Sequence, residues 1–372
     1  MSYPISRLWQ PRTSEAMSNI ANRPDFPNLI KDPDSYRDVL VGLKGRTPLF
    51  DMPQFNVFDD VPTDPMHCIF LGVMRKLMFK TFNAGETSRQ TEPRMPVDLF
   101  NELFSQCKVP SEQTRKPRVF NHFWKASEFR CALLMLYPIL INVLVEHPSP
   151  NQGKLQDIWC NLFYISLYVH GDADQHLLLI AREAMLSFKR NYTEYFGPDS
   201  INLNVHLFSH ILNTHAYFGN LSKVSAIRSE ALYQSFLRSF KAGTRNVAMQ
   251  ATKNIYLKYQ LTHKCTPPMI LRNKETVRTQ DNYVFTAGYN IYRIVQVNEG
   301  ELVCREVKGR EFIYQCNNGP RLRFTDFGTF KAPFEENPYE QSIHVNDIEG
   351  KVVMHSQFCV CVPRTTLAGG YF

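Results

Sequence analysis

The sequence lacks the features of a secreted, membrane-spanning or zinc-finger protein. Its nine cysteines include no CxxC pair, so cysteines alone cannot close a zinc ribbon or finger. The first thirty residues contain no apolar stretch of the kind found in signal peptides, and no run of 18 apolar residues occurs. An odd number of cysteines without a leader favours reduced thiols. We therefore expect a nuclear or cytoplasmic protein that is not secreted and does not contact a membrane.

A strong charge of either sign is also missing. The chain carries 42 Lys and Arg against 35 Asp and Glu, which gives a formal net charge of +7. This balance permits a polyanionic partner such as DNA but does not require one. Apolar and aromatic residues are abundant, at 44% hydrophobic residues with 27 Phe and 17 Tyr among 372. Such a composition indicates a packed globular protein of two or three domains.

Three regions of the chain differ in pattern. Residues 1–62 are rich in Pro, Asp, Asn and Arg, and we expect a partly ordered lead-in with one helix around Ser35–Leu43. Residues 63–265 have mainly helical periodicity, with apolar residues at spacings of three and four from Met66 onward. Residues 281–365 change to short β-rich runs separated by turns. The sequence therefore predicts a segregated α+β fold, with a mainly helical body followed by a small β-barrel-like module.

Individual elements can be placed within these regions. Further helices are expected at Glu128–Leu144, Lys154–Val169, Asp174–Tyr195 and Asn202–His215. Strands are expected at Tyr283–Thr286, Ile291–Val297, Glu301–Val307, Glu311–Cys316, Lys351–Met354 and Phe358–Val362. Turns are expected at Asn298-Glu-Gly300 and Lys308-Gly309.

Three local features could carry chemistry. Asp64-Pro-Met-His67 opens the first predicted helix of the body. His206 and His210 stand at i and i+4, which places both imidazoles on one face of a helix. Glu230 lies in a helical pattern that would turn it inward together with the apolar residues around it, namely Tyr233, Leu237 and Phe240.

Each feature also has a simpler structural interpretation. Asp64 before a helix can serve as an N-cap. A histidine pair at this spacing arises by chance, and a zinc metalloprotease is excluded because Leu207 stands where HExxH requires Glu. A Glu on an apolar helical face usually lies at the rim, with its stem packed and its carboxylate in water.

The order of these features resembles the C-terminal half of the DDE DNA transposases of the CACTA/Mirage/Chapaev superfamily, over roughly residues 40–255. It is also distantly similar to the V(D)J recombinase. The resembling segments are Asp64-Pro-Met-His67 with Leu71-Gly72-Val73, Arg115-Lys-Pro-Arg118, Phe123–Arg130, Leu133–Pro138, Tyr195-Phe-Gly197, Asn204–His210, Gly219–Ser222, and Glu230 with Lys241 downstream. The resemblance implies that the helical body is the C-terminal part of an RNase H-like core with its helical insertion.

The resemblance also implies roles for the site residues. DDE enzymes hold two divalent metal ions, normally Mg²⁺, between three acidic side chains and carry out in-line phosphoryl transfer. Glu230 matches the third acid of that set. In these enzymes a histidine pair upstream joins a CxxC to bind structural zinc, so His206 and His210 match half of a zinc site. We expect the two histidines to lie within reach of each other and Glu230 to lie nearby.

This chain departs from the family pattern in one respect. The first two acids and the CxxC normally precede the Asp-x-Met-His motif, and only 63 residues precede Asp64 here. No candidate acid among them stands in a buried strand pattern. We expect an incomplete zinc site, and no strand transfer by this chain in isolation, because one carboxylate cannot hold two Mg²⁺ ions.

Three hypotheses for function follow. The first is a transposase-derived protein with residual DNA or chromatin association through Arg115, Lys116, Arg118 and Lys125, which alternate with Phe120, Phe123 and Trp124. A solvated loop explains the same basic run. The second is one half of a split transposase whose partner chain supplies the missing acids. The third is a peptide or histone reader formed by the β module, with an aromatic cage from Tyr283, Tyr289, Tyr292 and Tyr314, which core packing explains equally well.

Overall fold

The structure is a computed structural model. It describes residues 14–31, 46–56, 60–82, 97–107, 109–110, 118–146, 152–171, 175–227, 229–230, 233, 249–250, 252–253, 283–298, 301–317 and 319–363. The chain divides into two compact units, of which the first contains Asp64–Phe372 and the second Tyr3–Thr63.

The second unit has short helices around a small apolar core. They are α1 (Ser14–Ala21), α2 (Phe26–Leu29) and the 3-10 turn η1 (Pro48–Asp51). Ala21, Phe26 and Leu29 form the core. The helix expected at Ser35–Leu43 lies outside the described residues, and the sequence pattern does not predict α1.

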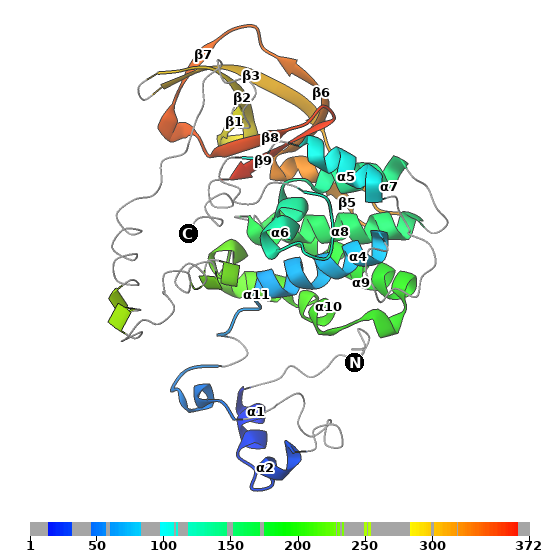
Figure 1. Ribbon diagram of the computed structural model, residues 1–372, viewed down its shortest axis with the longest axis vertical. Helices are drawn as coiled ribbons and strands as arrows, with labels where there is room; N and C mark the ends of the chain where they lie inside the picture. The colour runs from blue at the N-terminus through cyan, green and yellow to red at the C-terminus, as the bar shows by residue number, and fades with distance from the viewer. Residues whose placement is uncertain are drawn as a thin grey trace. The chain divides into compact units, whose positions relative to one another are not determined.

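The first unit begins with the helical body (Figure 1). Its longer helices are the π-helix η2 (Met66–Met74), α4 (Arg75–Phe82), α5 (Val97–Gln106), α6 (Ala126–Leu134), α7 (Tyr137–Glu146), α8 (Gln152–His170), α9 (Gln175–Phe196), α10 (Leu203–Phe208) and α11 (Ile211–Phe218). Two 3-10 turns, η3 (Pro198–Ser200) and η4 (Leu221–Lys223), lie before α10 and after α11. The predicted helices at Lys154–Val169 and Asp174–Tyr195 are confirmed by α8 and α9.

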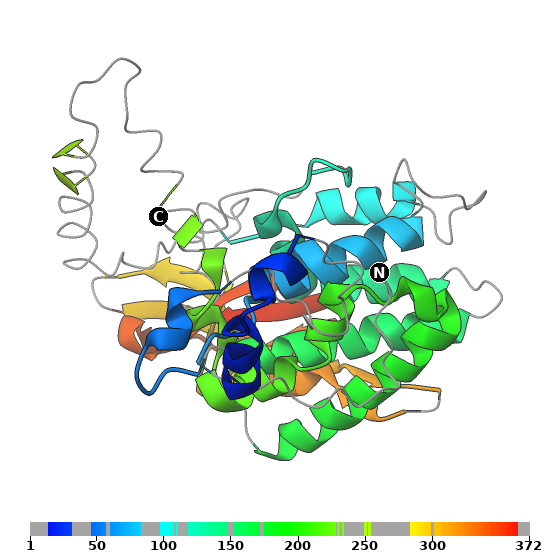
Figure 2. The same cartoon turned by 90° about the horizontal axis from the view of Figure 1, so that it is seen from below.

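The core of the body surrounds α8, which is buried on nearly every side and mostly apolar. Leu155, Trp159 and Phe163 are all fully buried along it. A helix that is hydrophobic all round packs inside a protein. The indole of Trp159 donates to Thr81 Oγ1 of α4 at 3.2 Å, so the buried N–H has a partner. The helices α8 and α9 pack along each other and form the long pair in the view from below (Figure 2).

Two predicted helices are each broken in two. The helix expected at Glu128–Leu144 divides into α6 and α7, which meet at 65°. Pro138 stands in the second position of α7. A proline has no N–H to donate, and its ring would clash with the preceding turn of a continuous helix. The helix expected at Asn202–His215 divides into α10 and α11 at Ser209 and His210.

The β module follows, with strands β1 (Tyr283–Thr286), β2 (Asn290–Val297), β3 (Glu301–Glu311), β6 (Thr329–Glu336), β7 (Gln341–His344), β8 (Gly350–Met354) and β9 (Phe358–Pro363) in one antiparallel sheet. The order β2-β1-β8-β9-β6-β3, with β3 pairing back to β2, closes six strands into a barrel, and β7 pairs with β3. A separate hairpin joins β4 (Ile313–Gln315) to β5 (Arg321–Arg323). Short 3-10 turns complete the module: η6 (Ala287–Tyr289), η7 (Phe324–Phe327) and η8 (Val345–Asp347). The segregated α+β architecture is confirmed.

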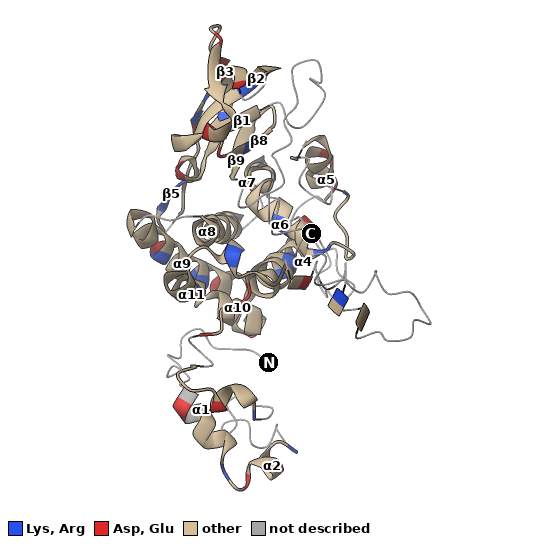
Figure 3. Ribbon diagram, turned by 90° about the vertical axis from the view of Figure 1, so that its left-hand side faces the viewer, with Lys and Arg blue, Asp and Glu red and all other residues tan. Residues whose placement is uncertain are grey.

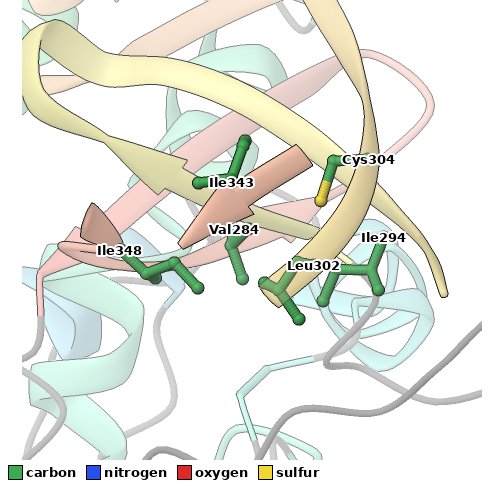
Figure 4. Packing of buried hydrophobic residues seen from close by; sticks show 6 residues of the cluster. All are labelled: Val284, Ile294, Leu302, Cys304, Ile343 and Ile348. Atoms are coloured by element: carbon green, nitrogen blue, oxygen red, sulfur yellow. The ribbon is translucent and has the colours of Figure 1, made fainter. Parts of the chain in front are cut away.

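The module has two apolar clusters because side chains of β1 alternate between its faces. Phe285 joins one cluster with Ile291 and Val307. Val284 joins the other, which Figure 4 shows with Leu302 and Ile343. The strand predictions are confirmed at β1, β2, β3, β4, β8 and β9, although β3 is longer and β4 shorter than expected. The strands β5, β6 and β7 are not predicted by the sequence pattern.

The turn expected at Lys308-Gly309 is wrong, because β3 continues through it. The register to β6 shifts between Lys308 and Arg310, which marks a bulge. A Cβ on Gly309 would lie 2.8 Å from Phe330 Cβ and Phe334 Cε1, so the glycine allows close strand packing. Gly309 is therefore a packing residue within a strand.

A buried aspartate joins the β4–β5 hairpin to the helical body. Asp157 of α8 is 1% exposed and accepts hydrogen bonds from Asn317 N at 3.1 Å and Tyr314 Oη at 3.1 Å. Asn191 of α9 donates to the same carboxylate at 3.3 Å. Burial raises the pKa of the Asp157 carboxyl. A second contact, from Tyr137 Oη to Thr329 Oγ1 at 2.6 Å, joins α7 to β6.

Within the described residues, no single helix is long and apolar enough to cross a membrane; only the bent pair Ala126–Leu134 with Tyr137–Val145 meets that test, by length and composition alone.

Candidate functional site

Asp64 caps the first turn of η2. Its Oδ1 accepts from Met66 N at 3.1 Å and its Oδ2 from His67 N at 3.2 Å. These N–H groups have no acceptor within the helix, which is why an aspartate at this position stabilises it. The capping role expected from the sequence is confirmed.

The same carboxylate also holds the start of a distant helical segment. Ala226 N donates to Asp64 Oδ1 at 2.9 Å across 162 positions of sequence. Ala226, Ile227, Ser229 and Glu230 are helical where the structure describes them. Asp64 thus ties together the first turns of two helical segments, and Glu230 follows one turn after Ala226.

His67 bridges the two acids of the motifs. Its Nδ1 lies 2.5 Å from Asp64 Oδ2, and its Nε2 lies 3.3 Å from Glu230 Oε1. Because an ionised carboxylate only accepts, the Nδ1 proton points to Asp64, which fixes the orientation of the ring. The side chains of Asp64, His67 and Glu230 are 24%, 58% and 47% exposed. We call these three residues the Asp64 site.

Close packing around Gly72 explains why the Leu71-Gly72-Val73 segment has a glycine at this position. A Cβ at Gly72 would lie 2.7 Å from the His67 carbonyl and 2.8 Å from Asn204 Cβ. Cys68 Sγ donates to the Asn204 carbonyl at 3.6 Å in the same region. The glycine therefore lets α10 approach η2 closely, next to the turn that carries His67.

The Asp64 site does not fit two divalent metal ions. Four N–H donors already occupy the two oxygens of Asp64, which leaves no lone pair directed at a cation. Within the site, Glu230 is then the one acid whose carboxylate could still bind a metal ion, whereas two-metal chemistry needs several carboxylates. Among the described residues, no group of three or more His, Cys, Asp or Glu could hold a metal ion.

His206 and His210 lie close together, as expected, although not on one continuous helix. Their ring centroids are 4.9 Å apart and the planes meet at 72°. His206 belongs to α10, while His210 precedes α11 as its N-cap residue. Burial and the nearby ammonium of Lys189 lower the pKa of His210. The positive charge of Lys189 also disfavours a metal ion at this pair.

Glu230 differs from its expected surroundings. The sequence predicts an inward face shared with Tyr233, but Glu230 is about half exposed and Tyr233 is 60% exposed. Leu237 and Phe240 lie outside the described residues. Glu230 Oε1 contacts Nε2 of His67, whereas the resemblance implies the histidine pair as its neighbour.

The basic run has a structural part and an exposed part. The Arg118 guanidinium pairs with the buried Glu128 carboxylate and donates to the Phe123 carbonyl at 2.9 Å. Glu128 also accepts from Lys125 N at 2.7 Å. The charge of Arg118 therefore compensates a buried acid, and its expected role in DNA binding stays a prediction. Nothing in the sequence distinguishes Glu128 as that partner.

The aromatic residues of this run also divide. Phe120 and Trp124 are buried, with ring centroids 5.0 Å apart, in a cluster with Phe82, Phe100 and Phe129. Neither is open to stacking with a base. Phe123 is 61% exposed and Lys125 is exposed. Arg115 and Lys116 lie outside the described residues.

The four tyrosines proposed as an aromatic cage do not gather at one place. Tyr283 and Tyr289 pack against the cluster of Phe285, whereas Tyr292 packs against the cluster of Val284. Tyr314 belongs to the separate hairpin and hydrogen-bonds Asp157. The prediction that these four tyrosines form one aromatic cage is therefore wrong.

Comparisons of the chain with protein-family models, with curated proteins and with solved structures find no match.

Proposed function

We propose that this chain is a transposase-derived protein that associates with DNA in the nucleus and is catalytically incomplete by itself. In this proposal its helical body corresponds to the C-terminal part of an RNase H-like transposase core with its helical insertion. One observation carries the proposal. Asp64 and His67 of one family-like motif contact the segment of Glu230 in another, although more than 160 positions separate them. This contact between two of the resembling motifs supports the resemblance.

The proposal of incomplete catalysis rests on the state of the carboxylates. In-line phosphoryl transfer needs acids that hold two metal ions against water. Asp64 is saturated by N–H donors, and Glu230 stands beside the imidazole of His67. We therefore assign the Asp64 site a structural role in this chain.

The proposed DNA contact is the loop from Arg118 to Lys125. Phe120 and Trp124 anchor this loop in the aromatic cluster, and the Arg118–Glu128 pair fixes its base. The anchored loop presents Phe123 and Lys125 to solvent. An exposed aromatic beside a cation suits stacking and phosphate contact. Lys and Arg are otherwise scattered over the described ribbon (Figure 3), so a local contact is favoured over a broad basic face.

The test measures binding of a fluorescent duplex against salt concentration. Joint replacement of Arg115, Lys116 and Lys125 by Ala should make the slope of log K against log salt shallower by roughly 0.9 for each phosphate that is no longer neutralised. Lys308→Ala, an exposed charge on the β module, is the matched control and should leave the slope unchanged. An equal effect of Lys308→Ala, or no binding at low salt, would refute the DNA association.

Activity is tested on supercoiled plasmid with Mg²⁺ or Mn²⁺. We expect no nicking by the purified chain. Nicking that disappears in Glu230→Gln would show that the acids are complete after all.

A second candidate is half of a split transposase. The exposure of His67 and Glu230 favours it, because a partner chain could reach both. Co-expression with a chain that supplies two acids and a CxxC should then produce Glu230-dependent nicking. No nicking in any such mixture would leave the incomplete protein as the better description.

A further inference from the structure

The β module carries an open pocket that the proposed function does not use. It lies between the β1–β2 connection and the segment from β7 to β8, with a volume of about 620 Å³. This is within the size range of binding pockets for small groups and side chains. Tyr292 and Ile343 contribute its apolar part, and both belong to or pack against the cluster shown in Figure 4. The apolar lining is therefore fixed by the core of the module.

The polar part of the lining is acidic. Asp347 and Glu349 contribute carboxylates, and none of the described lining residues is Lys or Arg. Neither acid forms an ion pair with another described residue. A second pocket, beside α9, shows the contrast. Its acids Glu311 and Asp326 both pair with Arg323. The charge at Asp347 and Glu349 is thus uncompensated by the described residues.

These two parts match one kind of group. A Lys or Arg side chain has an apolar stem and a cationic head, which can pack on Tyr292 and reach Asp347 or Glu349. Asn290 and Asn346 add amide groups that can orient a neighbouring peptide group.

The adjoining strand indicates a peptide and not a free amine. Among the described strands, β7 pairs with β3 and with no other. Ser342 and Ile343 of β7 line the pocket, so β7 runs beside it, and its second edge pairs with no described strand. Such an edge can take an extended peptide as a further strand, with alternate side chains directed to pockets.

We propose that the β module binds an extended basic peptide, which pairs with β7 and inserts a Lys or Arg side chain between Tyr292 and the Asp347–Glu349 pair. The proposal is independent of DNA binding, because it concerns a different part of the chain from the loop at Phe123.

The test uses the full chain and a fluorescein-labelled decapeptide of alternating Lys and Thr. Asp347→Asn combined with Glu349→Gln should weaken its binding by about tenfold or more, and Tyr292→Ala should weaken it too. The matched control combines Glu102→Gln with Glu335→Gln, which removes two exposed acids elsewhere. It should change binding by less than about twofold. Thermal melting of each variant shows that the fold is retained.

Two further arms separate the alternatives. A peptide with Glu in place of Lys should not bind, and a peptide methylated at alternate backbone nitrogens should bind at least about tenfold more weakly, because it cannot pair with β7. An equally large weakening in the control variant would show general charge attraction and refute the pocket. Full competition by spermidine at the same amine concentration, or equal binding of the methylated peptide, would refute strand pairing.

Discussion

Asp64 and Asp157 both collect hydrogen bonds from segments far away in the chain, but in opposite surroundings. Asp64 is partly exposed and receives Ala226 N from 162 positions away. Asp157 is 1% exposed and receives Asn317 N from 160 positions away. The first stands at an exposed site that the sequence singles out. The second stands at a junction between the helical body and the β4–β5 hairpin that the sequence does not indicate.

The difference shows how burial decides what such a hydrogen bond contributes. Donors left without Asp64 lie where water can partly reach them, so we expect mainly the stabilisation of the cap to disappear. Donors left without Asp157 remain in the interior and have no replacement partner. We therefore expect the loss of Asp157 to lower the free energy of unfolding more than the loss of Asp64.

Asp157→Ala should give the largest effect. It leaves Asn317 N–H and Tyr314 O–H without their acceptor, and we expect a decrease of about 4 kcal/mol in the free energy of unfolding. Urea denaturation measures it. Asp157→Asn keeps an acceptor and should destabilise the fold much less. If Asp157→Ala lowered the free energy of unfolding by less than about 1 kcal/mol, Asp157 would contribute no more than Asp64 does.

The next effect is the pH dependence caused by a buried imidazole. Burial, with the charges of Arg130 and His215 beside it, lowers the pKa of His170 from 6.5 to about 4. Its Nδ1 contacts the Ser166 carbonyl at 2.7 Å. Below pH 6.5 the imidazole of His170 binds a proton in the unfolded chain but not in the folded chain. The contribution of neutral His170 to the free energy of unfolding is therefore fully present above pH 6.5. It falls by about 3 kcal/mol as pH drops to 4.

Denaturation at a series of pH values compares His170→Phe with His67→Gln. The first variant should lose this part of the pH dependence, and the exposed His67 variant should keep it. The same slope in both variants would assign the effect to other groups.

Asp64→Ala should have a smaller effect, of about 1 to 2 kcal/mol, since it removes an N-cap from two helical starts that water can partly reach. Asp64→Asn retains an acceptor and should be less destabilising. Circular dichroism during urea denaturation measures both. An effect as large as that of Asp157→Ala would mean that the Asp64 site is a buried junction like the other.

Glu230→Gln should have the smallest effect, below about 0.5 kcal/mol, because its exposed contact with His67 contributes little, and salt screens that contact when the imidazole is protonated. The same urea denaturation, repeated at high salt, checks it. A salt-independent destabilisation above about 1 kcal/mol would contradict this expectation.

Short-range patterns in the sequence predict much of this protein. The β-rich runs of β1 and β2, the periodicity of α8 and α9, and the cap at Asp64 all depend on residues a few positions apart, so local sequence encodes them. The prediction of one helix over Glu128–Leu144 missed the break at Pro138, although the proline itself explains that break. The strand β5 is not predicted because its three residues are too few to show an alternation, and β6 is not predicted because Pro333 stands within it.

Tertiary structure alone decides which distant groups meet. The spacing of residues along a chain carries no information about a partner 160 positions away, so neither Ala226 at Asp64 nor Asn317 at Asp157 could be derived from it. The same holds for the division of the basic run, where Arg118 compensates Glu128 while Phe123 and Lys125 stay exposed. Burial assigns those roles, and burial is a property of the folded chain as a whole.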